Sequence, residues 1–347
     1  MAWQVNQDIL SQIDDLKLEG RLADWRRAMK EAGYAVYVDR QRLFTESWKQ
    51  TEGKDIEIRR ALAFKHICEN IPITILPWEF IVGKATPGVV GATPAIDVCG
   101  DYMPAIWEES DEMTIGWSAH ATLSKEDKEI LRESAEIFRN ENVADMSNDA
   151  VRQVMGDWHD EAVRAHVVDP GLDAVFFGSS SSSCDFPYIV QNGIGSYITR
   201  AEKYIDAERA KPRPSADKIY FWQASIICME GMIELAHRYS DLASQMAEEE
   251  EDLKRKAELE SIADVLTRVP DKPATSFQEA LQSMAIVACG KIFEHPMHNY
   301  PHWGRGDQYL YPYFINDVES GKITVKEAGQ MLGELIGRWG TALHIMA

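Results

Sequence analysis

Three histidines in one short stretch are the residues of this sequence that come nearest to a metal site. They are spaced as His295-x2-His298-x3-His302, and the carboxylate of Glu294 stands beside them. Imidazoles at such spacing can bind a single zinc ion, and a carboxylate oxygen can be a further ligand. However, two prolines interrupt any helix that would align the rings, and no cysteine nearby completes a tetrahedral set. We therefore predict no metal site, and a histidine-site metalloenzyme remains an alternative that metal analysis of the purified protein would remove.

The segment 298–313, which reads HNYPHWGRGDQYLYPY, combines histidine, aromatic and charged side chains between two expected helices. Binding groups concentrate in loops that rigid elements hold in place. Arg305 and Asp307 are two residues apart, so they can form an ion pair across a turn. The sequence leaves two roles open for this pair: a buried link that staples the loop, or a contact to a substrate.

Several classes of function lack support. The sequence has no Walker A loop, no GxGxxG, no HExxH and no GxSxG, which argues against nucleotide-binding and α/β-hydrolase sites. Its 56 acidic and 36 basic residues give a net charge of −20, which disfavours nucleic-acid binding. We see no secretory signal and no apolar run of about 20 residues that would span a membrane. The five cysteines are scattered without a CxxC pair, as in reduced cytoplasmic proteins.

Helical periodicity is the strongest structural signal. Apolar residues follow one another at steps of three or four from Phe221 to Met246, which predicts a core-facing helix of about seven turns. The acidic run 248–252 predicts the polar start of the next helix. Capping boxes predict three further helix starts: Ser124 with Asp127, Ser276 with Glu279, and Thr324 with Glu327.

Strand signals are few and short. Residues 73–76 and 80–84 are apolar or β-branched runs on either side of 77–79, so they predict a short hairpin or paired strands. Residues 175–177 predict another strand. The composition of elements therefore indicates a predominantly helical α/β protein without a repeating βαβ pattern.

Four blocks of the sequence together resemble one known family. Residues 304–324 read GRGDQYLYPYFINDVESGKIT and resemble the GR-x-DQ-x-LYPYY-x-x-D-x-x-x-G-x-(I/L)T signature of glycyl-radical enzymes. Residues 40–84 contain R-x-x-x-x-T-E-S, then an acidic-to-RRA stretch, then IPI-x-I-x-x-x-E-x-IVG, and are similar to the family's opening block. Residues 221–247 and 268–283 match two further blocks in the expected order. The resemblance to the pyruvate formate-lyase type of this family therefore covers nearly the whole chain.

The resemblance implies a fold and a chemistry. Members of the family form a barrel of ten β-strands, built from two parallel five-stranded halves and wrapped by helices. A radical is stored on a glycine in a C-terminal loop and passed to a cysteine on a loop inside the barrel, whose thiyl abstracts hydrogen from the substrate. A separate activating enzyme, which uses S-adenosylmethionine and an iron–sulfur cluster, installs the radical. The closed barrel excludes solvent and oxygen.

The sequence departs from the family where the radical is made. Family members are roughly twice as long, and their radical glycine lies in an RVxG motif. No RVxG occurs here, since Arg268 and Val269 continue into Pro270. The thiyl cysteine would fall beyond Ala347, and Cys184 lies in an upstream loop that does not match its place.

We therefore predict that residues 1–347 are an incomplete pyruvate formate-lyase-like domain that lacks the glycine-radical domain and has no catalytic residue or bound cofactor of its own. The implied partners are the missing C-terminal half and the activating enzyme. The alternative is a truncated product or a helical interaction subunit without catalysis. A partial barrel leaves strand edges and apolar surface uncovered, so we also expect association or poor solubility of the chain alone.

The resemblance also nominates pocket residues. Where the family's dehydratases carry G-H-x-x-P-D-Y, this sequence has Ser181 at the histidine's place and Asp185 at the aspartate's. In the block N-G-H-S-x-S-x-G-R, His302 falls where the second serine stands. These changes weaken a simple polyol-dehydratase reading and leave a decarboxylase, a C–N or C–S lyase, or a hydrocarbon-adding synthase open. The candidate pocket residues are Ser181, Asp185, His302, Trp303, Arg305 and Asp307.

Overall fold

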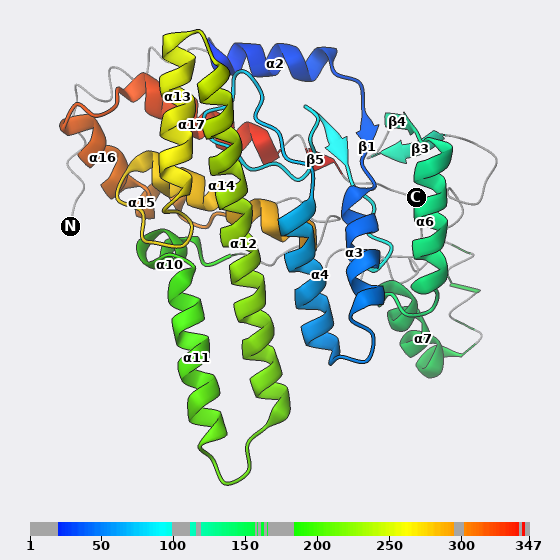
Figure 1. Cartoon of the computed structure of the whole chain (residues 1–347). Coiled ribbons are helices and arrows are strands. Elements are labelled where there is room, and N and C mark those ends of the chain that lie inside the picture. The colour runs from blue at the N-terminus through cyan, green and yellow to red at the C-terminus, as the bar shows by residue number, and fades with distance from the viewer. Residues whose placement is uncertain are drawn as a thin grey trace.

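The helix α14 (Phe277–Glu294) lies at the centre of the protein. Its sequence is mostly apolar, and nearly all of its residues are buried. A helix that is hydrophobic all round needs neighbours on each face. Here they include α4, α10, α12, α13, α16 and α17, which surround it in the computed structural model (Figure 1).

The structure describes residues 20–98, 112–115, 119–156, 158, 161–162, 165, 184–294, 302–339 and 342–343. The helices within these ranges are α2 (Arg21–Glu31), α3 (Asp39–Gln50), α4 (Ile56–Asn70), α6 (Lys125–Ile137), α7 (Val143–Met155), α10 (Phe186–Asn192), α11 (Gly195–Arg209), α12 (Ala216–Glu249), α13 (Leu253–Leu266), α14, α15 (Gly306–Tyr309), α16 (Tyr311–Glu319) and α17 (Val325–Trp339). No helix among these residues is long and apolar enough to cross a bilayer.

The strands are short and few in the described part of the chain. β1 (Ala35–Val36), β2 (Gly91–Ala92) and β5 (Ala342–Leu343) form a parallel sheet in the order β1-β2-β5. In its register Ala35 pairs with Gly91, and Gly91 pairs with Ala342. β3 (Glu112–Ile115) and β4 (Ala119–Thr122) form an antiparallel hairpin. The prediction of a predominantly helical α/β chain agrees with this arrangement.

The predicted helix starts are confirmed, with one variation. Ser124 and Asp127 form a complete capping box at α6, and Asp252 caps α13 at the end of the acidic run. The backbone N–H of Thr324 donates to Glu327 at 2.8 Å, and that of Glu327 donates back to Thr324 at 3.2 Å.

At the start of α14 only one of the two hydrogen bonds of the predicted Ser276–Glu279 capping box forms. The N–H of Glu279 donates to the Ser276 hydroxyl at 3.2 Å, but the Glu279 carboxylate accepts from the N–H of Thr275 at 2.6 Å. The first helical N–H, that of Phe277, donates to Asp317 of α16 instead. A tertiary contact therefore completes this cap.

The predicted hairpin at 73–76 and 80–84 is wrong. Neither run forms a strand, and residues 80 and 81 lie in a bend. Side chains of distant helices instead satisfy the backbone of residues 80–82. Glu334 of α17 accepts from the N–H groups of Phe80 and Ile81 at 2.7 and 2.9 Å. The Gln282 amide bonds both the N–H and the carbonyl of Val82, at 2.9 and 2.7 Å. Side chains of α14 and α17 therefore hold residues 80–82 in place. The predicted strand at 175–177 lies outside the described residues.

The apolar stripe of α12 is buried only in part. Met232, Leu235 and Tyr239 belong to the core, as predicted. Phe221, however, is 58% exposed. It lies where α11 and the first half of α12 project from the body as a two-helix arm (Figure 1). The prediction of a fully core-facing helix therefore holds for its C-terminal half alone.

Candidate functional site

A buried ion pair holds the C-terminal end of α14, from which the chain continues towards the candidate segment 298–313. The side chains of Arg40 of α3 and Asp97 are each about 1% exposed and form a bidentate ion pair. Arg40 Nη2 donates to Asp97 Oδ2 at 3.1 Å. The Nε–H of Arg40 donates to the carbonyl of Phe293 at 2.8 Å. Its guanidinium also lies over the ring of Phe44, 4.9 Å from the centroid. The last carbonyls of a helix lack partners within the helix, so this arginine satisfies one of them directly.

A second arginine reinforces the same helix end. Arg60 of α4 pairs with the carboxylate of Glu294, and its Nη2 lies 3.6 Å from Asp97. Burial opposes the charge on Arg60, but Glu294 and Asp97 outweigh it and raise the pKa of the guanidinium. Two cations at the negative end of a helix are also favoured by its dipole. Residue 294 therefore leaves α14 from a fixed position.

Trp303 and Tyr309 hold the far end of the segment. The hydroxyl of Tyr309, a buried residue of α15, donates to the carbonyl of Trp303 at 3.0 Å. Burial raises the pKa of this phenol, so it remains an O–H donor at neutral pH. Trp303 itself is half-buried against the core. Gly304 follows with a φ of +60°, a conformation that favours glycine.

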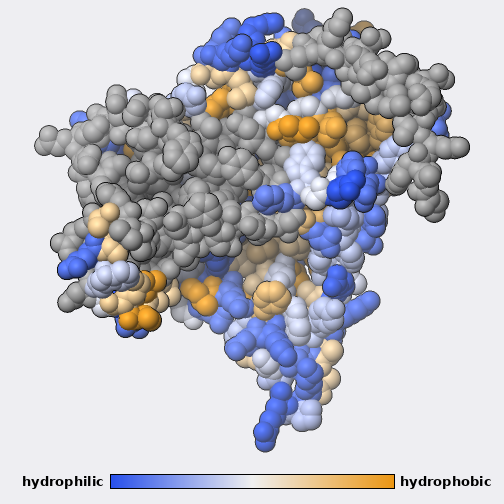
Figure 2. All heavy atoms as spheres, turned by 180° about the vertical axis from the view of Figure 1, so that it is seen from behind, coloured by the Kyte–Doolittle hydropathy of each residue, from blue (hydrophilic) through white to orange (hydrophobic). Residues whose placement is uncertain are grey.

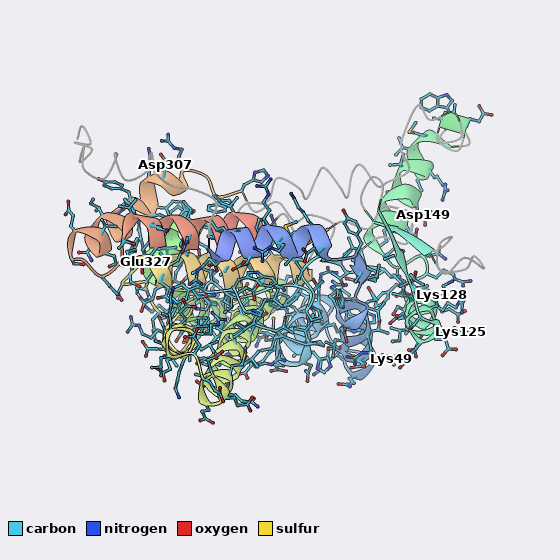
Figure 3. All side chains as sticks on the ribbon, turned by 90° about the horizontal axis from the view of Figure 1, so that it is seen from above. Lys49, Lys125, Lys128, Asp149, Asp307 and Glu327 are labelled. Atoms are coloured by element: carbon cyan, nitrogen blue, oxygen red, sulfur yellow. The ribbon has the colours of Figure 1, made fainter. Side chains whose placement is uncertain are left out.

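The predicted Arg305–Asp307 ion pair is present but exposed. Arg305 Nε and Nη2 donate to the two carboxylate oxygens of Asp307 at 2.9 and 2.7 Å. The hydrogen bonds from Arg305 hold the pKa of the Asp307 carboxyl below its usual range. The side chains are 69% and 64% exposed, and Asp307 lies on the outer side of α15 (Figure 3). The buried-staple alternative is therefore wrong, and both groups face outward.

The other candidates divide between two elements. Asp185 caps α10 by accepting from the N–H of Tyr188 at 3.3 Å, so its carboxylate has a structural task at the helix start. His302 is exposed on the same segment as Trp303. Ser181 lies outside the described residues. His295 and His298 do too, so the three-histidine site stays untested; in the described ranges no cluster of three ligating side chains occurs.

The sequence alone did not predict the clamp that Arg40, Asp97 and Arg60 form at the end of α14. Arg40 stood in the opening motif without a role, and Asp97, 57 positions away, was not singled out. One available signal was a lone arginine on the apolar face of a helix that also carries Leu43 and Phe44. Such a cation needs a buried partner. The identity of that partner could not be read from the chain.

Cys228 of α12 provides a test of how this region is packed. Burial, followed by the charge of Glu294, raises the pKa of its thiol from 9.0 to about 12. The thiolate fraction at neutral pH should then be roughly 1000-fold lower in the folded than in the unfolded protein. We expect iodoacetamide to modify Cys228 correspondingly slowly in native protein, as measured by peptide mass spectrometry.

The pH dependence has a defined sign. A raised pKa favours the folded state while the thiol is neutral, so the contribution of Cys228 to stability is present below pH 9 and is lost as pH rises towards 12. Native alkylation should accelerate over that window, whereas alkylation of the unfolded chain should be half-maximal near pH 9 and level off above it. Equal rates in folded and unfolded protein at pH 7 would contradict the packing described here.

Comparison with known proteins connects this arrangement to a family. The family model described as "Pyruvate formate lyase-like" matches residues 7–341. Isethionate sulfite-lyase of Oleidesulfovibrio alaskensis is 30% identical over 310 residues, covering 86% of this chain and 36% of that protein. The glycerol-bound B12-independent glycerol dehydratase of Clostridium butyricum superposes with a TM-score of 0.81 at 29% identity, covering 93% of this chain and 40% of that one.

A glycyl radical enzyme from Archaeoglobus fulgidus superposes equally widely, with a TM-score of 0.80 at 29% identity over 93% of this chain and 40% of its own. The chain thus spans between a third and a half of the length of the relatives it matches. The family model nevertheless covers nearly all of the sequence, and the folds superpose over the same range. The chain belongs to the pyruvate formate lyase-like family of glycyl radical enzymes.

Proposed function

We propose that this chain forms the N-terminal part of a glycyl-radical lyase and becomes active only with the rest of the domain. In this proposal β1, β2 and β5 are strands of one parallel half of the family's barrel, and the surrounding helices are its outer layer. The observation that carries the proposal is the close superposition over 93% of this chain on only 40% of a solved relative. The sequence also lacks an RVxG motif to carry the radical.

In this proposal the chain holds the segment between α14 and α15 in place beside the substrate. Arg40, Asp97 and Arg60 fix the start of the segment that follows α14, and Tyr309 fixes its end at Trp303. His302, Trp303, Arg305 and Asp307 would form part of a substrate pocket wall, together with Ser181 and Asp185. The radical would be installed by an activating enzyme with S-adenosylmethionine and an iron–sulfur cluster, in the cytoplasm, and no cofactor is assigned to this chain.

The reaction class we propose is radical cleavage or formation of a C–C, C–O, C–N or C–S bond. The relatives named above include a sulfite-lyase and a dehydratase, so their names span C–S and C–O chemistry. Against the dehydratase blocks, this sequence has Ser181 and His302 at altered places. That difference favours a lyase other than a polyol dehydratase.

A second candidate is a helical interaction subunit without catalysis. The observation that favours it is an exposed apolar groove between α16 and α17, which fits a protein partner. The two functions differ in the coding sequence that adjoins this one. A cysteine-bearing loop and an RVxG motif there would support the lyase, and the lack of both would support the interaction subunit.

The direct test is anaerobic reconstitution. The chain would be produced alone, and separately together with the rest of its domain, each with the activating enzyme. We expect a glycyl radical and turnover of a screened panel of hydroxylated, carboxylated and sulfonated small molecules with the complete domain only. Turnover by residues 1–347 alone would contradict the proposal.

A further inference from the structure

A groove between α16 and α17 is lined mainly by apolar side chains. It has a volume of about 580 Å³. Phe277 at the start of α14 is one of the lining residues and meets the ring of Phe314 edge-on, with 5.7 Å between the ring centroids. Hydrophobic residues are exposed in places on the rear face of the molecule (Figure 2). The remaining apolar lining residues are Trp303, Leu310, Tyr311, Val325, Ala328, Leu332 and Ile336.

The lining of the groove offers little to bind a charged ligand. Asp307 is the one charged residue that lines the groove in the described part of the chain, and Arg305 already pairs with it. Asp307 lies on the outer side of α15 (Figure 3). Meanwhile Ile336 on the opposite wall is 56% exposed, although Val325 and Ala328 of the same helix are buried. A groove of this kind fits an apolar stretch of polypeptide.

We propose that this groove is the docking site for an apolar segment from the part of the domain that lies beyond this chain. The inference rests on the proposed function and adds the place where the two parts join. The solved relatives superpose on 93% of this chain, but the superposition covers only 40% of their own length. More than half of each relative is therefore polypeptide without a counterpart in this chain. That polypeptide can cover surface that the described residues leave open.

The position of β5 and the net charge of the chain both favour this occupant over a second copy of the chain. α17 forms one wall of the groove and leads within three residues to β5, which lies at an edge of the parallel sheet as described. Bare edges of parallel sheets are rare in complete domains, so one missing part can supply both the neighbouring strand and the covering segment. A second copy would instead bring another net charge of −20, and like charge opposes association.

Photocrosslinking in cells that make the complete domain tests the proposal. Benzoylphenylalanine would replace Ile336 in the groove and, in a second variant, Asp307 at its mouth. A matched control would carry it at Leu253, which is 80% exposed on α13, between Asp252 and Lys254. All three sites are exposed, so folding should be preserved, and circular dichroism melting curves would verify it.

We expect both groove probes to crosslink to one peptide from beyond residue 347, with a yield clearly above that at Leu253. Crosslinks to residues 1–19, to a second copy of the chain, or to no polypeptide would overturn the proposal. Equal yields from all three positions would overturn it as well. Electron paramagnetic resonance and product analysis on the unsubstituted complete domain, with the Leu253 control beside it, separate the two hypotheses. A glycyl radical without the groove crosslink defeats the docking site alone, whereas the lack of both radical and product defeats the proposed function.

Discussion

Replacing Asp97 with alanine should lower the free energy of unfolding by about 3–5 kcal/mol, because it leaves the cation of Arg40 buried without its partner. Arg40 and Asp97 are each about 1% exposed, and water cannot compensate for the lost carboxylate. Arg60, 3.6 Å from Asp97, loses a favourable charge as well. Urea denaturation followed by circular dichroism would measure the change. Asp97→Asn keeps an acceptor oxygen and should lie between the wild type and Asp97→Ala.

The chain offers a matched control for this variant. Asp307 forms an equally well-aligned pair with Arg305, but both side chains are exposed. Exposed ion pairs contribute little because water and salt screen them. Asp307→Ala should therefore leave the denaturation midpoint unchanged. If Asp97→Ala were as harmless as Asp307→Ala, the clamp at the end of α14 would not exist in solution.

Gly193→Ala should destabilise the protein by at least about 3 kcal/mol, since it combines backbone strain with a steric clash. Gly193 joins α10 to α11 with a φ of +72°, where a side chain is disfavoured. A Cβ atom there would meet the carbonyl oxygen of Asp271 and lie 2.6 Å from the carbonyl carbon of Lys272. These are backbone atoms of a neighbouring segment whose carbonyls accept from the N–H groups of Ile194 and Gly195, so they cannot move aside without breaking those hydrogen bonds.

Gly321→Ala separates the two causes. Gly321 has a similar φ of +70°, but an added Cβ would find no atom within 4 Å. Its substitution should cost only the conformational strain, about 1–2 kcal/mol. Thermal melting of both variants would show the difference. Equal losses at the two positions would mean that the junction of α10 and α11 does not pack against residues 271–272 as described.

The local part of the fold was predictable from the sequence. Capping residues such as Ser124 and Thr324 act through neighbours three positions away, so their pattern alone fixes the helix start. The four family blocks likewise predicted the family that the comparisons identify. The ion pair of Arg305 with Asp307 was predictable for the same reason, as its partners are adjacent in the chain.

The features that depend on long-range contacts were not predictable. Residues 80–84 have the composition of a strand, yet Glu334 and Gln282, about 200 or more positions away, satisfy their backbone. Phe221 continues an apolar stripe that the core covers only from its middle onward. The exposure of the Arg305–Asp307 pair also depends on packing, which no spacing rule encodes.

The central claim is that this chain supplies scaffold and part of a pocket wall for radical chemistry whose glycine lies elsewhere in the domain. Anaerobic activation of purified residues 1–347, followed by electron paramagnetic resonance, tests it most directly. The account predicts no glycine-centred signal from this chain, and a glycyl doublet once the rest of the domain is present. A glycine-centred doublet from residues 1–347 alone would contradict it.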